Sequence, residues 1–158
     1  MNGAKVEFPP LLDVGMHEMT LPDLRQLCVG NFPLSTTRGQ FMRGIEALCG
    51  SLSTALLKTE VWVNGSFLTV KIDPRDADLV VKIPASLLSN ASVEQQALIA
   101  RIVNNEFLGC DCNIFAEYLH GDPNFAVGDM MVSYWKRQFG FSRGANFKGI
   151  AVIRTPLS

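Results

Sequence analysis

Long apolar runs are missing from the sequence, and none approaches the roughly 20 residues that a membrane-spanning helix needs. A charged-then-apolar leader is also missing from the amino terminus. Hydrophobic residues make up 47% of the chain and charged residues 18%, which is enough apolar mass for a substantial core. We therefore expect a soluble, cytoplasmic protein whose residues 1–158 form a single domain.

The sequence has little of what a zinc site requires. Its two histidines, His17 and His120, lie far from Cys110 and Cys112 along the chain. These two cysteines are separated by one residue, whereas zinc-binding motifs use two or more. On a strand the alternation of side chains would place both thiols on one face, where we expect them to pack as small hydrophobic residues.

A strong charge of one sign is also absent, because the formal net charge is −1. General binding to nucleic acid is therefore not expected. Charge is nevertheless uneven, since residues 130–158 carry five basic residues and no Asp or Glu. Arg143 and Lys148 lie beside glycines just before the last predicted strand, where they could reach a triphosphate or a phosphorylated partner. The alternative interpretation of Arg143 and Lys148 is a solvated basic loop that balances acidic charge elsewhere in the chain.

The first third of the chain is predicted to form an extended arm followed by two helices. Residues 1–19 contain two prolines and are expected to form an extended arm. The sequence Thr20-Leu-Pro-Asp23 combines a capping residue with an early proline, and it predicts a short helix to about Val29. A longer helix is predicted to begin at Thr36 or Thr37, because apolar residues then recur at helical spacing. This core-facing stripe consists of Phe41, Ile45, Leu48, Leu52 and Leu56.

Strands and helices then alternate. The segments predicted as strands are 61–63, 78–83, 110–118 and 149–153, and those predicted as helices are 92–108 and 127–139. The segment 78–83 is nearly all apolar, which is typical of a strand covered on both faces. The helix at 92–108 opens with a capping box, Ser92-Val-Glu-Gln95. We expect an α/β (α+β) fold in which a mixed sheet packs against helices.

One stretch, GSFLTVKIDPRDAD, combines residues that suit phosphate and metal chemistry. Gly65 and Ser66 are followed by nine residues and then by Asp76 and Asp78. Residues two apart on a strand point the same way and lie roughly 7 Å apart, so both carboxylates could share Mg²⁺. Two such ions about 3.5–4 Å apart would clamp the attacking and leaving oxygens of a phosphoryl displacement. A lone Gly-Ser or a lone Asp-x-Asp is usually an ordinary turn or a solvated loop, but here both lie between apolar strands.

This stretch resembles the signature of the nucleotidyltransferase superfamily typified by DNA polymerase beta. That signature is an apolar residue, Gly, then Gly or Ser, a spacer of comparable length, and Asp, an apolar residue, Asp or Glu, and a further apolar residue. The flanks WVNGSF and DPRDADLVV are similar to those of small bacterial minimal nucleotidyltransferases and of a related uncharacterised bacterial family. The sequence departs from the minimal enzymes in the spacer, where Phe67-Leu-Thr-Val-Lys71 replaces a basic, Gly-rich Arg-x-Arg-Gly.

The resemblance implies a role for each residue of the stretch. Asp76 and Asp78 would hold Mg²⁺, and Gly65 with Ser66 would bind the triphosphate, with Lys71 as a weaker candidate. The superfamily usually adds a third carboxylate on a later strand, as a metal ligand or as the general base. Asp111, at the start of the strand at 110–118, is the candidate for this third position. Glu117 is the alternative if the register of that strand differs.

Two functions follow as expectations from the resemblance. The first is a Mg²⁺-dependent enzyme that moves a nucleoside monophosphate from an NTP, with ATP favoured, to a hydroxyl. By analogy with the minimal nucleotidyltransferases, that hydroxyl could lie on a partner protein, as in toxin–antitoxin systems, on RNA or on a small molecule. The second is a catalytically inactive, nucleotidyltransferase-like antitoxin or regulatory protein that acts by binding a partner.

Overall fold

The structure is a computed structural model that describes residues 7–140 and 148–157. The described residues form a five-stranded mixed sheet in the order β1-β5-β2-β3-β4. Its strands are β1 (Gly15–Glu18), β2 (Thr59–Asn64), β3 (Ala77–Pro84), β4 (Cys110–Glu117) and β5 (Gly149–Thr155). β1 runs parallel to β5 and β3 parallel to β4, while β2 is antiparallel to both of its neighbours. The predicted α+β fold, a mixed sheet packed against helices, is confirmed.

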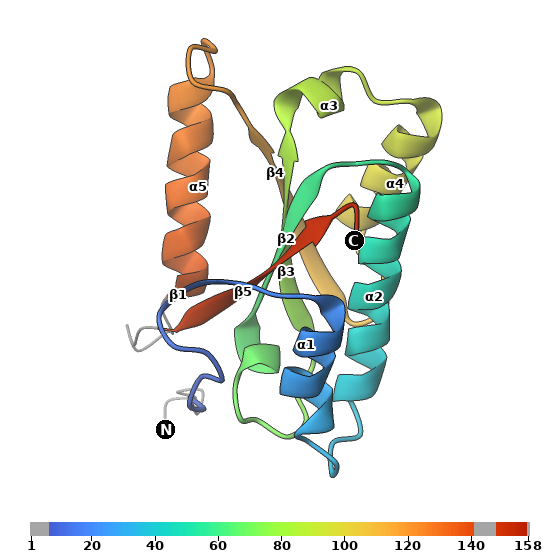
Figure 1. The fold of residues 1–158 in the computed structure, drawn as a ribbon, viewed down its shortest axis with the longest axis vertical. Helices are drawn as coiled ribbons and strands as arrows, with labels where there is room; N and C mark the ends of the chain where they lie inside the picture. Colours follow the sequence, from blue (N-terminus) through green and yellow to red (C-terminus); the bar gives the residue numbers. More distant parts are fainter. Residues whose placement is uncertain (1–6, 141–147, 158) are drawn as a thin grey trace, which may run out of the picture.

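Helices cover both faces of this sheet (Figure 1). The described helices are α1 (Leu21–Arg25), α2 (Arg38–Thr54), α3 (Ala85–Ser89), α4 (Val93–Val103) and α5 (Phe125–Gly140). In addition, α1 continues as the π-helical turn η1 (Gln26–Gly30), and the 3-10 turn η2 (Gly65–Leu68) follows β2. In Figure 1, α1, α2 and α4 lie on one side of the strands and α5 lies on the other. None of the described helices combines the length and the apolar character that crossing a membrane requires.

The main core lies between the sheet and the helices α1, α2 and α4. Alternate strand residues such as Val63, Leu79 and Val81 point into it, together with the stripe of α2 that begins at Phe41. Cys110 and Cys112 belong to the same core, so the prediction that they pack as small hydrophobic residues is confirmed. Cys28 and Cys49 are likewise buried and free.

A second, smaller core lies under α5. It contains Trp62, Val80, Phe115, Ile150 and Val152 from the sheet, and Val132 and Trp135 of α5 pack against it. The ring of Trp62 meets that of Phe115 edge to face, with 5.5 Å between centroids. Because β3 contributes residues to both cores, the prediction that it is covered on both faces is confirmed.

Both predicted helix starts carry a capping box, at Thr20, where a capping residue was predicted, and at Ser92, where the box itself was predicted. The hydroxyl of Thr20 accepts a hydrogen bond from the Asp23 amide at 3.2 Å, and the Asp23 carboxylate accepts from the Thr20 amide. At the start of α4, Ser92 and Gln95 exchange the same pair of hydrogen bonds, at 3.1 and 2.9 Å. These side chains satisfy amide groups that the first turn of a helix leaves without a partner.

Several predicted boundaries are wrong. The amino-terminal arm contains β1, which pairs with β5 and adds an edge strand to the sheet. Leu56 leaves the predicted stripe, because it adopts a φ of 59° after the end of α2 and is 75% exposed, while Leu57 is buried instead. The helix predicted to reach residue 108 ends at Val103, since Asn105 has a φ of 56° and its side chain accepts from the Cys112 amide at 2.7 Å. The short helix α3, which was not predicted, follows the end of β3 at Pro84.

Candidate functional site

Three aspartates converge at one end of the sheet. Asp76 immediately precedes β3, Asp78 is the second residue of β3, and Asp111 is the second residue of β4. One carboxylate oxygen from each lies within 4.8 Å of the others. Asp76 and Asp78 are half-buried and Asp111 is exposed, so the cluster opens to solvent on the Asp111 side. The sequence motif supplies two of these residues, and the fold adds the third.

The pairing of β3 with β4 brings in the third carboxylate. The two strands are parallel, and Asp78 is the register partner of Asp111, so both side chains lie on the same face of the sheet. Glu117 lies at the far end of β4, where it forms an ion pair with Lys82 at 2.9 Å. The structure therefore brings Asp111, and not Glu117, beside the two aspartates of the motif.

Gly65 forms a tight turn against this cluster. Its φ is +80°, a conformation that L-amino acids with a side chain rarely adopt. A Cβ added at this position would collide with the carboxylate of Asp78. The position therefore requires a glycine for two reasons: the positive φ, and the Asp78 carboxylate that fills the place of a side chain.

Asn64 is a residue of this site that the sequence analysis missed. It is fully buried, it is the register partner of Asp78 on β2, and its side-chain oxygen accepts a hydrogen bond from the Gly65 amide at 2.7 Å. Asn64, Asp78 and Asp111 thus form a polar row across three strands at the end of the sheet. The sequence feature that could have identified Asn64 is its place as the last, polar residue of an apolar strand, directly before a glycine.

The chemistry of this donor set suits a hard divalent cation. All of its ligand atoms are carboxylate oxygens, which Mg²⁺ prefers, and thiol ligands are excluded because Cys110 and Cys112 face the opposite side of the sheet. Burial raises the pKa of both thiols to about 12, so they stay protonated at neutral pH. Asp111 is exposed, so an ion held by the three carboxylates would be accessible to water and to ligands from solvent. Asp76, Asp78 and Asp111 are the residues that would hold such an ion.

Comparison with known proteins places the chain in a family. Residues 6–154 match the model of a family of unknown function (DUF6932). The chain belongs to DUF6932. Neither the curated proteins nor the solved structures give a match. The matched range includes the Gly65 turn and all three aspartates, so the carboxylate site of this DUF6932 chain lies within the part that defines the family.

The other predicted phosphate-binding residues of the DUF6932 chain that the structure describes are Ser66, Lys71 and Lys148. Ser66 directly follows Gly65 in η2 and is half-buried. The ammonium group of Lys71 lies over the ring of Phe8, 5.8 Å from its centroid. Lys148 is half-buried and immediately precedes β5, while Arg143 lies outside the described residues. Of the described residues in this set, Ser66 is next to the site through its bond to Gly65. Lys148 lies at the same end of the sheet, because Ala151 of β5 is the register partner of Val63, two residues before Gly65.

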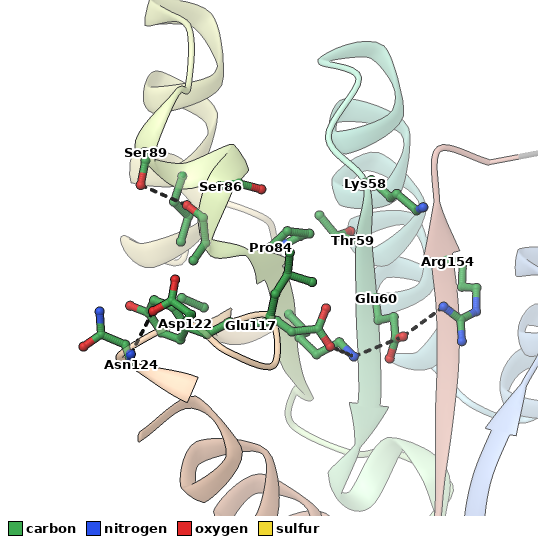
Figure 2. Close-up of a pocket in the computed structure, with 16 residues that line it drawn as sticks. Lys58, Thr59, Glu60, Pro84, Ser86, Ser89, Glu117, Asp122, Asn124 and Arg154 are labelled. Atoms are coloured by element: carbon green, nitrogen blue, oxygen red, sulfur yellow. Dashed lines mark hydrogen bonds and ion pairs between the residues drawn. The ribbon is translucent and has the colours of Figure 1, made fainter. Parts of the chain in front are cut away.

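A groove of about 630 Å³ lies at the opposite end of the DUF6932 sheet (Figure 2). It is bounded by α3, by the segment between β4 and α5, and by the ends of β2 and β5. Ion pairs cross its floor from Glu117 to Lys82, from Lys82 to Glu60 at 3.2 Å, and from Glu60 to Arg154 at 2.9 Å. The charges of this groove are therefore paired with one another.

Glu60 is the centre of this charged row. Burial works to raise the pKa of Glu60, but the hydrogen bond from Trp62 and the charges of Lys82 and Arg154 outweigh it and hold the pKa below its usual range. Arg154 continues the row to Glu18 on β1. The row therefore ties together all five strands at the end of the sheet that lies away from the aspartates.

Proposed function

We propose that this chain is a Mg²⁺-dependent nucleotidyltransferase that moves a nucleoside monophosphate from an NTP, with ATP as the favoured nucleotide, to a hydroxyl acceptor. The observation that carries the proposal is the convergence of Asp76, Asp78 and Asp111 within 4.8 Å beside the Gly65 turn. Carboxylates on adjacent strands next to a turn without a side chain are suited to hold metal-bound phosphates. The resemblance of the Gly65–Asp78 stretch to the nucleotidyltransferase signature supports the same activity.

Each residue of the site would have its own role in the reaction. Asp76 and Asp78 would hold Mg²⁺, which neutralises charge on the triphosphate when it is bound. The acceptor oxygen attacks the α-phosphorus, the bond from that phosphorus to the bridging oxygen breaks, and pyrophosphate leaves with the bonding electrons. Asp111 is the exposed carboxylate of the three, so it is accessible to the acceptor and takes the proton of its hydroxyl. The Gly65 turn lets the Asp78 carboxylate lie directly against the backbone, where Ser66 follows as the candidate contact to the triphosphate.

The test is label transfer from ATP in the presence of Mg²⁺ and candidate acceptors, namely partner proteins, RNA and small hydroxyl compounds. Transfer should require both Asp76 and Asp78, so the double variant Asp76→Asn, Asp78→Asn should lose it by more than about 10²-fold. Asp122→Asn is the matched control, because Asp122 is an exposed aspartate that lines the groove at the other end of the sheet. Transfer that is unchanged in the double variant would refute the assignment.

A protein-binding role without catalysis is the second candidate, and the outer surface of α5 favours it. Val127, Met130 and Tyr134 recur at helical spacing on α5 and are 60%, 70% and 49% exposed. Such a regulator or antitoxin would form a stable complex with its partner protein, and the complex and its effect would survive loss of Asp76 and Asp78. If the double Asn variant still binds the partner but no longer neutralises it, catalysis is required and the binding role alone is excluded.

A further inference from the structure

Arg38 is a buried arginine whose partners are main-chain oxygens. It is the first residue of α2 and its side chain is fully buried. In the part of the chain that the structure describes, its hydrogen bonds go to carbonyl groups of η1 and of the segment after Gly65. The acceptors are Cys28 at 3.0 Å, Ser66 at 3.5 Å, Phe67 at 2.6 Å, Thr69 at 2.5 Å and Lys71 at 2.6 and 3.1 Å.

The surroundings of Arg38 hold its guanidinium in one orientation. Its central carbon lies 3.7 Å from the centroid of the Phe32 ring and 5.4 Å from that of Phe67. Burial lowers the pKa of Arg38, while Cys28 and Asp73 oppose that shift. A planar group with five donors, stacked on a ring and surrounded by carbonyls, fixes several backbone positions at once. Lysine has three donors on one nitrogen and cannot reproduce this geometry.

A second contact fastens the same segment to α2 from the other side. The carboxylate of Asp73 accepts from the Thr36 amide at 2.7 Å and from the Ser35 hydroxyl at 3.1 Å, just before α2 begins. Residues 66–73 are therefore attached to the start of α2 through Arg38 and through Asp73. The segment begins at the Gly65 turn and leads into Asp76, so it connects two parts of the carboxylate site.

We propose that Arg38 is the positioning residue of the nucleotide site, where it keeps the Gly65–Ser66 turn in the shape that receives the triphosphate. This inference rests on the proposed function. Asp78 and Asp111 are held by strand pairing, whereas the segment after the turn is held by Arg38 and Asp73 and by main-chain hydrogen bonds to residues 9–11. Loss of Arg38 therefore affects binding of the nucleotide far more than binding of the metal ion alone.

The test compares Arg38→Lys and Arg38→Gln with wild type, with Arg43→Gln as control, since Arg43 is an exposed arginine on the same helix. Binding of Mn²⁺ alone, followed by its paramagnetic resonance signal, should change less than about twofold in the Arg38 variants. KM for Mg²⁺·ATP should rise tenfold or more, which corresponds to about 1.4 kcal/mol of lost binding. Amide hydrogen exchange in residues 66–72 should accelerate at least tenfold, while exchange in β2–β4 stays unchanged. In Arg38→Ala, added guanidinium should restore nucleotide affinity and an equal concentration of ammonium should not.

Three results would overturn the proposal: a folded Arg38→Gln variant with wild-type KM and wild-type exchange, equal loss of Mn²⁺ and nucleotide binding, or faster exchange throughout the chain. The last result would mean that Arg38 supports the whole fold. Failure of the proposed function gives a different outcome, because wild-type protein would then bind no Mn²⁺ and transfer no label. The exchange of residues 66–72 in the variants still decides the role of Arg38 in that case.

Discussion

Single residues decide the shape of the carboxylate site, and they differ in how visible they are in the sequence. Asp76, Asp78 and Gly65 stand in a recognisable spacing, so the sequence alone is enough to select them. Arg38 cannot be selected in this way, because a charged residue at the start of a helix is normally exposed, and its burial depends on carbonyl groups far along the chain. Local patterns reveal residues that share one segment, whereas long-range contacts stay hidden.

Replacing Gly65 by alanine should disable the site and leave the fold in place. The positive φ alone should lower the free energy of unfolding by about 1–3 kcal/mol. The new methyl group would also displace the carboxylate of Asp78, so Mn²⁺ affinity measured by calorimetry should fall at least tenfold. Gly121→Ala is the control, since Gly121 has a φ of 98° but no neighbour within 4 Å of an added Cβ. Equal Mn²⁺ affinity in the two variants would contradict the collision.

The buried thiols predict a loss of stability at alkaline pH. Burial raises the pKa of all four cysteines to about 12, against about 8.5 in an unfolded chain. Between these values the unfolded chain releases protons that the native protein retains. The free energy of unfolding should therefore fall as pH rises above about 9, by at most about 1.4 kcal/mol per pH unit for each thiol.

Urea unfolding between pH 7 and pH 10 measures this slope. Cys49→Ala should be less stable at pH 7, because Cys49 is fully buried and alanine leaves a cavity, but its stability should decline less steeply with pH. A slope that does not change in Cys49→Ala would show that this thiol does not titrate on unfolding.

Elements with a strong local pattern could be predicted from the sequence, and elements defined by their partners could not. β3 and α4 were expected because one is a continuous apolar run and the other opens with a capping box. β1 has four largely exposed residues and exists as a strand through its pairing with β5, so nothing local distinguished it from an extended arm. The five-residue helix α3 lacks a side-chain cap and contains no fully buried residue, which leaves it almost without a sequence signal.

Lys82 on β3 should prove important for the end of the sheet that carries the charged row. Lys82 pairs with Glu60 and Glu117, and its side chain is only 14% exposed. Lys82→Met leaves Glu60 half-buried with one cation fewer, so the free energy of unfolding at pH 7 should fall by about 1–3 kcal/mol. Lys58→Met, at an exposed lysine that lines the same groove, should change it by less than about 0.5 kcal/mol.

The loss of unfolding free energy in Lys82→Met should depend on pH. The pKa of Glu60 is below its usual range in the native protein, so its interactions stabilise the fold above about pH 4.3 and lose their effect as pH falls through the native pKa. Stabilities of wild type and Lys82→Met, measured by urea unfolding, should therefore converge as Glu60 takes up a proton. A difference that is the same at pH 7 and at acid pH would exclude this electrostatic origin.

At the scale of the whole molecule, the topology assembles the site from distant segments. The turn after β2, the start of β3 and the start of β4 meet at one end of the sheet, because β2 ends where the two parallel strands begin. The sequence alone could not decide between Asp111 and Glu117, since that choice depends on the register of β4 against β3. The opposite end of the sheet carries the groove and the paired charges, so the two ends differ in chemistry.

Divalent cations should stabilise the whole fold through the three aspartates. At a concentration 100 times the dissociation constant, a ligand that binds only the native state adds about 2.7 kcal/mol. For a chain of this size, that corresponds to a rise in Tm of about 5–10 °C, measurable by calorimetry with Mg²⁺ against EDTA. Asp78→Asn and Asp111→Asn should abolish the rise, and Asp122→Asn should keep it. A rise that persists in both site variants would place the cation elsewhere.

The pairing of Asp78 with Asp111 also limits how the gene can change. Two thiols that face the main core flank Asp111. Moving β4 by one position along β3 would therefore bury a carboxylate and bring a thiol beside Asp76 and Asp78. Insertions or deletions between α4 and β4 therefore cannot be absorbed by sliding the strand, and they must loop outward into solvent. Length variation among relatives should accordingly collect in the bend at residues 104–109, while the spacing from Gly109 to Asp111 remains constant.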